Sequence, residues 1–177
     1  MKAITIWQPW ASLIMIGAKP HEFRPASFLD RRSYGNGPSA GERIVIQAGA
    51  RAVKPAEVED LLRRIDAEAH GTAREGDRTC LVLDKARELL LKVRAAHKYR
   101  LLPLGMALGS AVIGKPILSC DLFRMNVADS DRGNFNWAWP LSEIRHFEPP
   151  FPVKGSQGFF EIALPDDGHL QEGSDHG

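Results

Sequence analysis

The alternation of apolar and polar positions along the chain predicts a protein built mainly from β-strands. In residues 2–7, Ile4 and Ile6 share one face of a strand with period two. We predict further strands over residues 19–23, 43–48, 109–123, 136–139 and 158–164, and extended chain with three prolines over residues 148–154. Gly114 and Pro116 predict a bend in the longest strand.

Helical spacing of apolar residues occurs in three places. The strongest helix covers residues 54–70. It has a proline at its start and is followed by a glycine. A second helical stretch covers residues 80–99, and a short helix begins at Pro9 and ends before Gly17. The two longer helices interrupt the series of strands, so we interpret them as an insertion.

These elements predict an α+β fold that is mainly β, in which about six strands curve into a small barrel with inserted helices. A doubly wound sheet would need strands and helices to alternate regularly, and they do not. We expect one domain over residues 1–164, with a helical insertion at about 54–100, and a disordered acidic tail over residues 165–177. The loop of residues 25–41 is long enough to act as a flap over a site.

Composition narrows the classes of partner. The 177 residues are 44% hydrophobic and 25% charged, with a formal net charge of +1, so a nucleic-acid partner would need a local positive patch. Cys80 and Cys120 are far apart and the histidines are solitary, so we predict no metal and no cofactor. Gln8 and Pro9 interrupt the N-terminal apolar run, which argues against a signal peptide, and no run is long enough to span a membrane. We therefore expect a cytoplasmic protein that binds no membrane.

Two catalytic motifs match the sequence only in part. Residues 37–41 read G-x-S-x-G, but the nucleophile elbow needs a strand before the motif and a helix after it, and here a loop precedes and a strand follows. His21 and Glu22 are adjacent, so the H-x-E of zinc deaminases lacks its spacer. We predict neither activity.

The most informative charges are Lys19, Glu22 and Arg24, which follow the helix stop at Gly17. Strand geometry places Glu22 and Arg24 on one face roughly 7 Å apart, close enough to pair. Hydrophobic collapse does not require this cluster. The alternative interpretation is a surface ion pair worth about 0–1 kcal/mol.

Several stretches together resemble the ASCH domain family, whose signature is GxKxxExR. The signature matches residues 17–24, shortly after the WQPWA of residues 7–11. Supporting stretches are residues 42–49 (ERIVIQAG), 109–115 (GSAVIGK), 137–141 (WAWPL) and 154–160 (KGSQGFF). The similarity spans most of residues 1–164 and leaves out the 54–100 helices and the tail.

The resemblance implies a PUA-like curved barrel in which the signature segment lines a cleft that binds RNA, another single-stranded nucleic acid or a modified nucleotide. Lys19, Arg24 and Arg51 would hold phosphate. Glu22 would accept a hydrogen bond from an exocyclic amine or a 2′-OH, and an indole would stack a base. The expected nucleic-acid-binding set is Trp7, Gln8, Trp10, Lys19, Glu22, Arg24 and Arg51. The cations of residues 85–100 either extend the phosphate track or simply face solvent.

Two other functions stay open. Some ASCH proteins are reported to act as ribonucleases or as amidohydrolases on N4-acetylcytidine, and in such a hydrolase Lys19 and Glu22 are the candidate catalytic residues. In the amidohydrolase branch a Thr occupies the position of Glu22, and many members have a His near Gln47. The third possibility is a protein-interaction module whose cleft takes an acidic peptide.

Overall fold

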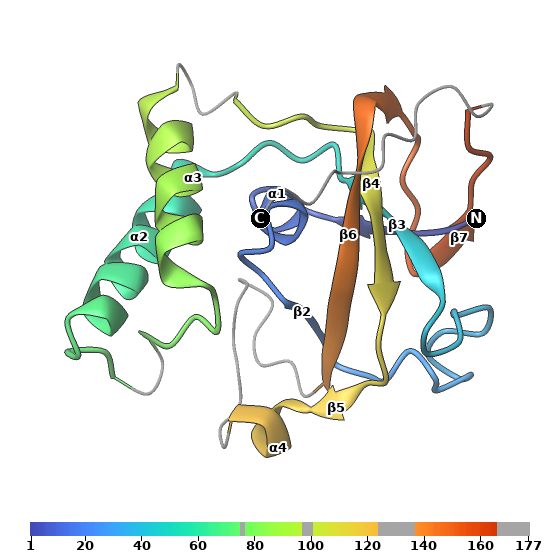
Figure 1. Ribbon diagram of the computed structural model, residues 1–177, viewed down its shortest axis with the longest axis horizontal. Helices are drawn as coiled ribbons and strands as arrows, with labels where there is room; N and C mark the ends of the chain where they lie inside the picture. Colours follow the sequence, from blue (N-terminus) through green and yellow to red (C-terminus); the bar gives the residue numbers. More distant parts are fainter. Residues whose placement is uncertain (75–76, 97–100, 124–136, 166–177) are drawn as a thin grey trace, which may run out of the picture.

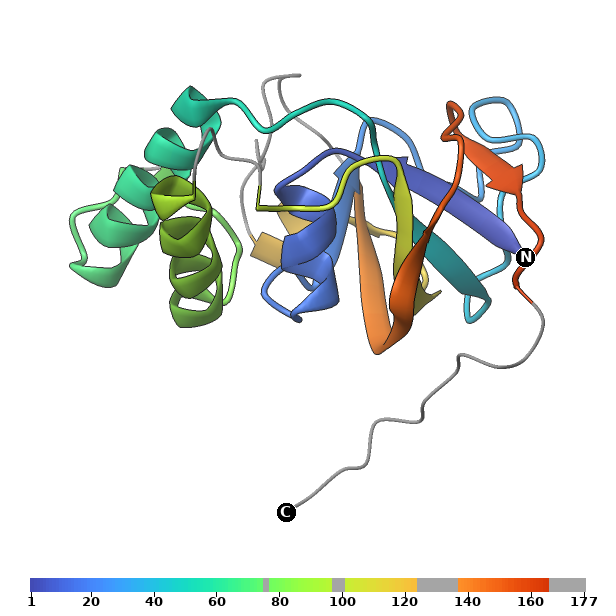
Figure 2. The same ribbon diagram turned by 90° about the horizontal axis from the view of Figure 1, so that it is seen from above.

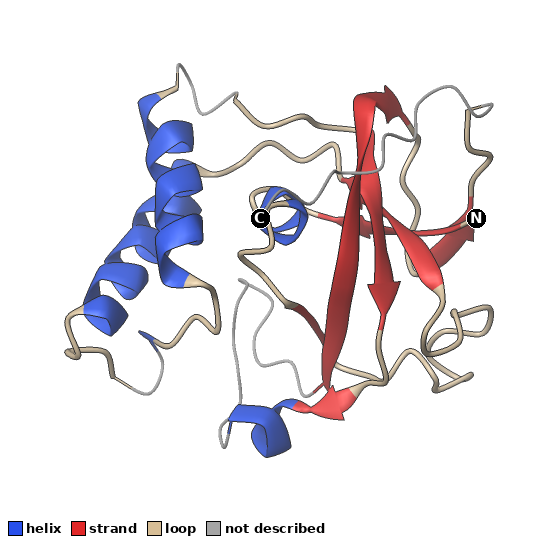
Figure 3. Cartoon of the chain, viewed as in Figure 1, coloured by secondary structure: helices blue, strands red, loops and turns tan. Residues whose placement is uncertain are grey.

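A computed structural model describes residues 1–74, 77–96, 101–123 and 137–165 of the chain. Except for Pro165, the predicted tail lies outside these residues. The described strands are β1 (Lys2–Ile6), β2 (His21–Arg24), β3 (Arg43–Ala48), β4 (Met106–Ile113), β5 (Ile117–Leu118), β6 (Trp137–Pro152) and β7 (Phe159–Glu161) (Figure 1). The described helices are α1 (Trp10–Met15), α2 (Pro55–Ala69), α3 (Leu83–Ala95) and α4 (Ser119–Phe123) (Figure 3). None of these helices is long and apolar enough to cross a membrane.

Six strands form one curled sheet in the order β2-β6-β4-β3-β1-β7, and β5 pairs with β6 beside it. The β1–β3 pair is parallel, whereas the other described pairs are antiparallel. The register shifts once between β3 and β4 and twice between β4 and β6. Such irregularities increase the twist of a strand, so they account for the half-barrel curvature. The prediction of a mainly β, α+β fold with a curved sheet and a few helices is confirmed.

Two predicted strands differ from the observed ones. Residues 109–123 do not form one bent strand, because β4 ends at Ile113 and the chain continues as the short β5 and then as α4. In contrast, residues 136–139 and 148–154 belong largely to a single element, since β6 runs for 16 residues. Pro149 and Pro150 fit within β6 because the β4–β6 register shifts between the pairs formed by His146 and Phe151, where ladder hydrogen bonds are not needed.

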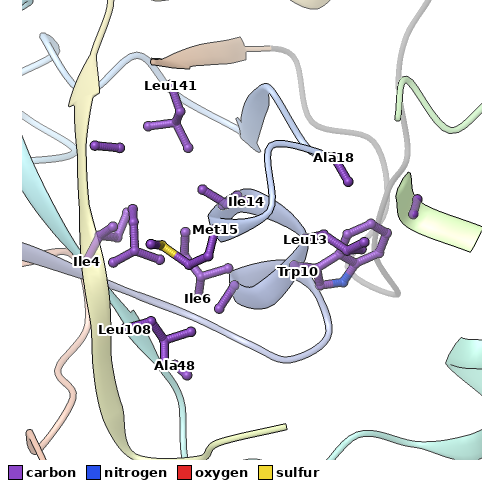
Figure 4. Close-up of a cluster of buried hydrophobic side chains, with 14 of the residues drawn as sticks. Ile4, Ile6, Trp10, Leu13, Ile14, Met15, Ala18, Ala48, Leu108 and Leu141 are labelled. Carbon is purple, nitrogen blue, oxygen red and sulfur yellow. The ribbon is translucent and has the colours of Figure 1, made fainter. Parts of the chain in front are cut away.

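Helix α1 lies between the sheet and the α2–α3 pair (Figure 2). All six of its residues are buried, which explains why it has no polar face. Ile14 and Met15 lie on the side of the helix that faces Ile4 and Leu108 of the sheet, whereas Leu13 lies on the other side beside Trp10 (Figure 4). The predicted stop is confirmed, since the N–H of residue 17, a glycine with φ +68°, donates to the Ile14 carbonyl at 2.9 Å.

The two inserted helices pack on the far side of α1 from the sheet (Figure 2). Apolar residues of α2 and α3 belong to the same buried cluster as α1, among them Val58, Leu61, Ile65, Leu90 and Val93. The Val82 N–H donates to the Ala18 carbonyl at 2.9 Å, which ties the start of α3 to the end of α1. The insertion therefore shares its hydrophobic core with the sheet.

A second, smaller apolar cluster lies on the opposite face of the sheet and consists of Ala3, Val45, Ala107 and Phe147. Because side chains alternate along a strand, the next residues on this face are Thr5 of β1 and Gln47 of β3. Thr5 and Gln47 are register partners in the parallel pair. The face of the sheet therefore changes from apolar to polar at the ends of β1 and β3.

Candidate functional site

The charges of the signature segment form a chain of contacts along β2. The Arg24 Nε–H donates to Glu22 Oε1 at 2.8 Å, so the pairing predicted from strand spacing is confirmed. The Lys19 Nζ lies 3.7 Å from Glu22 Oε2. Glu22 therefore bridges the two cations.

Lys19 is enclosed by the protein. Its side chain is 1% exposed, and its Nζ donates to the His21 carbonyl at 2.7 Å. The ammonium also lies 5.3 Å from the ring centre of Trp10 and 4.7 Å from that of Phe23. Aromatic faces attract cations, so these rings stabilise a charge that burial alone would disfavour. Burial, and secondarily the charge of Lys19, lowers the pKa of His21.

A cleft of about 900 Å³ opens beside this chain of charges. Its walls come from the ends of β1 and β3, the start of the loop after β2, and the loop from β6 to β7. The lining residues include Thr5, Trp7, Arg24, Pro25, Tyr34, Gln47, Gly49 and all of residues 153–158. Residues from four stretches of the chain, 7–11, 17–24, 42–49 and 154–160, therefore meet at one cleft, although they are far apart in sequence.

The charged side chains that line the cleft are cations. Its charged lining residues are Arg24 and Lys154, and no carboxylate is among the described residues that line it. Arg24 is oriented by two bonds, since its Nη2 donates to the Thr5 carbonyl at 3.3 Å while its Nε is held by Glu22. Its Nη1 makes no hydrogen bond to the described residues, which leaves a positioned donor for an anionic ligand.

Trp7 is the indole that belongs to the cleft. It is half-buried and lines the cavity, and the guanidinium carbon of Arg51 lies 4.1 Å from its ring centre. The Arg51 Nη2 in turn donates to Glu57 Oε1 at 2.7 Å. Arg51 therefore covers one face of the indole and is itself neutralised by Glu57.

The other predicted site residues do not line the cleft. Gln8 is fully buried, where its Nε2 donates to the Pro103 carbonyl and its Oε1 accepts from the Ser12 N–H. Trp10 is 8% exposed and belongs to the core. Lys19 and Glu22 are not among the residues that line this cleft. Of the expected set, Trp7 and Arg24 line it directly and Arg51 supports Trp7.

The lining residues that were not in the predicted set include Thr5, Gln47 and the loop of residues 153–158. A polar signal for Gln47 was present, because it is the one amide in the otherwise apolar run IVIQA of residues 44–48. Thr5 carries no such signal, because a β-branched residue is ordinary in a strand. The loop is recruited by the pairing of β7 with β1, which local sequence does not specify.

The segment predicted to act as a flap forms part of the wall. The ring centre of Tyr34 lies 5.1 Å from that of Trp139, and the ring centre of Phe28 lies 5.3 Å from that of the same indole. Both contacts are edge to face. Phe28 is fully buried. The segment is therefore anchored in the core by two aromatic side chains.

The cations of α3 are largely paired within the helical insertion. Arg87 pairs with Asp66, Lys92 with Glu88 and Arg94 with Glu59. The part of the predicted row that falls on residues 97–100 lies outside the described residues. The arrangement of the described cations favours a solvated helix face over a phosphate track.

Within the described part of the chain, no group of three His, Cys, Asp or Glu side chains is placed to hold a metal ion. Comparison of the chain with models of known protein families and with curated proteins finds no match.

Proposed function

We propose that this protein is a PUA-like, ASCH-type domain that binds RNA, or a single modified nucleotide, in the cleft between Trp7 and the loop of residues 153–158. One observation carries the proposal: the end of the GxKxxExR segment and three other ASCH-like stretches line a single cleft with a positive wall. Its volume of about 900 Å³ is within the range of ligand pockets, about 300–1,000 Å³.

The chemistry of the lining supports a nucleotide over an apolar ligand. Arg24 presents an oriented guanidinium, and Lys154 adds an exposed cation on the facing loop. Trp7 supplies an indole, and indoles contribute to the binding of unpaired bases by stacking. In this proposal Arg24 and Lys154 contact phosphate while Trp7 contacts the base.

The proposal concerns binding and does not extend to hydrolysis. Lys19 and Glu22 are the candidate catalytic residues, and both lie outside the lining of the cleft. Glu22 is engaged by two cations, and the Lys19 ammonium is bonded to a backbone carbonyl. We assign these two residues the role of positioning Arg24.

The test is fluorescence anisotropy with a labelled single-stranded RNA over a range of salt concentrations. We expect affinity to fall linearly with salt on logarithmic axes, because bound counterions are released. Arg24→Gln and Lys154→Gln should each weaken binding and reduce the slope by roughly 0.7 for each phosphate that the protein no longer neutralises. The matched control is Lys92→Gln, which removes an exposed cation of α3 and should change neither quantity.

Salt-independent binding, or unchanged binding by both Arg24→Gln and Lys154→Gln, would contradict the proposal. Competition with an acidic peptide distinguishes the interaction-module alternative, because a peptide that displaces RNA at low concentration would make the cleft a protein-binding site. Weakened binding by Lys92→Gln would restore the phosphate-track interpretation of α3.

A further inference from the structure

The floor of the cleft contains a buried acceptor that the protein leaves unused. Gln47 is 1% exposed, and its Nε2 donates to two carbonyls, Ala48 O at 2.7 Å and Val153 O at 3.1 Å. These two acceptors fix the orientation of the amide, because only its nitrogen can donate. The Gln47 Oε1 is therefore an acceptor, and it is buried without a hydrogen-bond partner among the described residues.

A second unused polar atom lies beside it. Thr5 is the register partner of Gln47, and its Oγ1 is also buried and makes no hydrogen bond to the described residues. A methyl group on Gly155 would lie 2.6 Å from Thr5 Oγ1 and 2.7 Å from Gln47 Oε1. The two oxygens therefore face one small volume, beside a loop position where only glycine fits.

An unused buried polar atom is costly, so each exception in a folded protein has a cause, such as a ligand, an ion or a bound water that supplies the missing partner. Both residues line the cleft, but their two oxygens are covered by the exposed loop that carries Gly155, so a ligand supplies the missing partners only by displacing this loop. The Arg24 guanidinium also bonds the Thr5 carbonyl, which places the phosphate-binding donor next to the same pair. Oriented polar pairs of this kind give specificity in pockets whose other walls give affinity.

We infer that Gln47 and Thr5 are the specificity-determining pair of the cleft and that they bind a nucleobase edge carrying an N–H beside a hydrogen-bond acceptor. The Gln47 Oε1 accepts from the base N–H, and the Thr5 hydroxyl donates to the adjacent acceptor. This inference rests on the proposed nucleotide-binding function and adds to it the chemical feature that is recognised.

The first experiment uses the unaltered protein and paired probes. Short oligo(U) and oligo(C) RNAs are compared with the same RNAs made from N3-methyluridine or N4,N4-dimethylcytidine. We expect methylation to weaken the better-bound probe by about tenfold or more, because it removes the donor and leaves Gln47 Oε1 buried and unpaired. Equal binding of the methylated and unmethylated probes would overturn the inference.

The second experiment uses Thr5→Val, which keeps the shape of the side chain and replaces the hydroxyl by a methyl group. We expect binding about tenfold weaker with thermal stability equal to or above that of the unaltered protein, since the hydroxyl has no partner in the described part of the fold. The matched control is Thr79→Val, because the Thr79 hydroxyl is buried and bonded to Glu68 Oε2 at 2.9 Å. This control should lose stability and keep its affinity.

The outcomes separate the two proposals. If the unaltered protein binds none of the RNAs, the proposed function fails. If RNA binds and Arg24→Gln weakens it while Thr5→Val leaves affinity unchanged, the function stands and the inference is wrong. If Thr5→Val loses stability but keeps affinity, a buried water satisfies the hydroxyl, and the inference is again wrong.

Discussion

Substitution of Lys19 by methionine tests whether the buried ammonium stabilises the fold. Met fills the space of the aliphatic part of the side chain, so Lys19→Met removes the charge without a large cavity. The Nζ lies 3.7 Å from Glu22 Oε2. At an effective dielectric constant of about 20, such a pair attracts by about 4 kcal/mol, although desolvation offsets several kcal/mol for each ion.

Breaking a buried pair by removing one partner typically destabilises by about 3–5 kcal/mol, because the other charge remains buried. Glu22 keeps Arg24 at 2.8 Å, so we expect the lower end, about 3 kcal/mol. For a protein of this size, that corresponds to a decrease in Tm of about 6 to 12 °C. The assays are thermal unfolding and urea unfolding. An unchanged m-value in urea would show that the substitution changes the free energy of unfolding and not the surface exposed on unfolding.

The matched control for Lys19→Met is Lys92→Met, because the Lys92–Glu88 pair has side chains that are 63% and 70% exposed. Exposed helical pairs contribute about 0.3–0.5 kcal/mol, so this variant should melt within about 2 °C of the unaltered protein. If Lys19→Met is as stable as Lys92→Met, the buried ammonium is no net stabiliser and the reasoning is wrong. In a Glu22→Gln background Lys19→Met should cost less, which a double-mutant cycle measures.

The remaining predictions concern the core, acid stability and the cleft. Trp139→Ala should destabilise by about 3–5 kcal/mol in urea unfolding, because the indole is fully buried and contacts three aromatic rings. The pKa of His21 is lowered in the fold, so the unfolded state binds more protons than the folded state below a pH of about 6.5. The free energy of unfolding should therefore decrease as the pH falls below that value. His21→Gln should flatten this pH dependence in unfolding measured from pH 7.5 to 5. Gly155→Ala should weaken RNA binding in the anisotropy assay and lower the Tm, since the methyl group would lie 2.6 Å from the buried Thr5 Oγ1 and the loop must shift. Unchanged affinity would show that the loop shifts without closing the site.

The elements that the sequence predicted well are those whose ends have a local chemical cause. Helix α2 begins at Pro55 and a left-handed Gly71 follows it, and both signals are independent of the rest of the fold. The predicted strand boundaries are wrong where pairing with a strand distant in sequence sets the end of the element. Residues 109–123 have strand composition throughout, but the pairing with β6 ends at Ile113 and resumes only at Ile117.

Some features of the candidate site could likewise be predicted from local sequence, and others could not. The pairing of Glu22 with Arg24 follows from the period of a strand, so the sequence alone was sufficient to predict it. The burial of Lys19 was not predictable from its neighbours, because lysine is usually exposed and the enclosing rings come from α1 as well as β2. Gln47 and residue 155 meet only because β1 pairs with β3 on one side and β7 on the other.

The contacts along β2 connect a buried side chain to a side chain that lines the cleft. Lys19 inside the fold holds Glu22, Glu22 holds the Nε of Arg24, and Arg24 lines the cleft. Weaker RNA binding by a Lys19 variant would therefore not show that Lys19 touches the ligand, since the same weakening follows from a misplaced Arg24. A decisive comparison measures Lys19→Met and Arg24→Gln at a temperature where both are fully folded. If Lys19 acts only through Arg24, the double variant should bind no more weakly than Arg24→Gln alone.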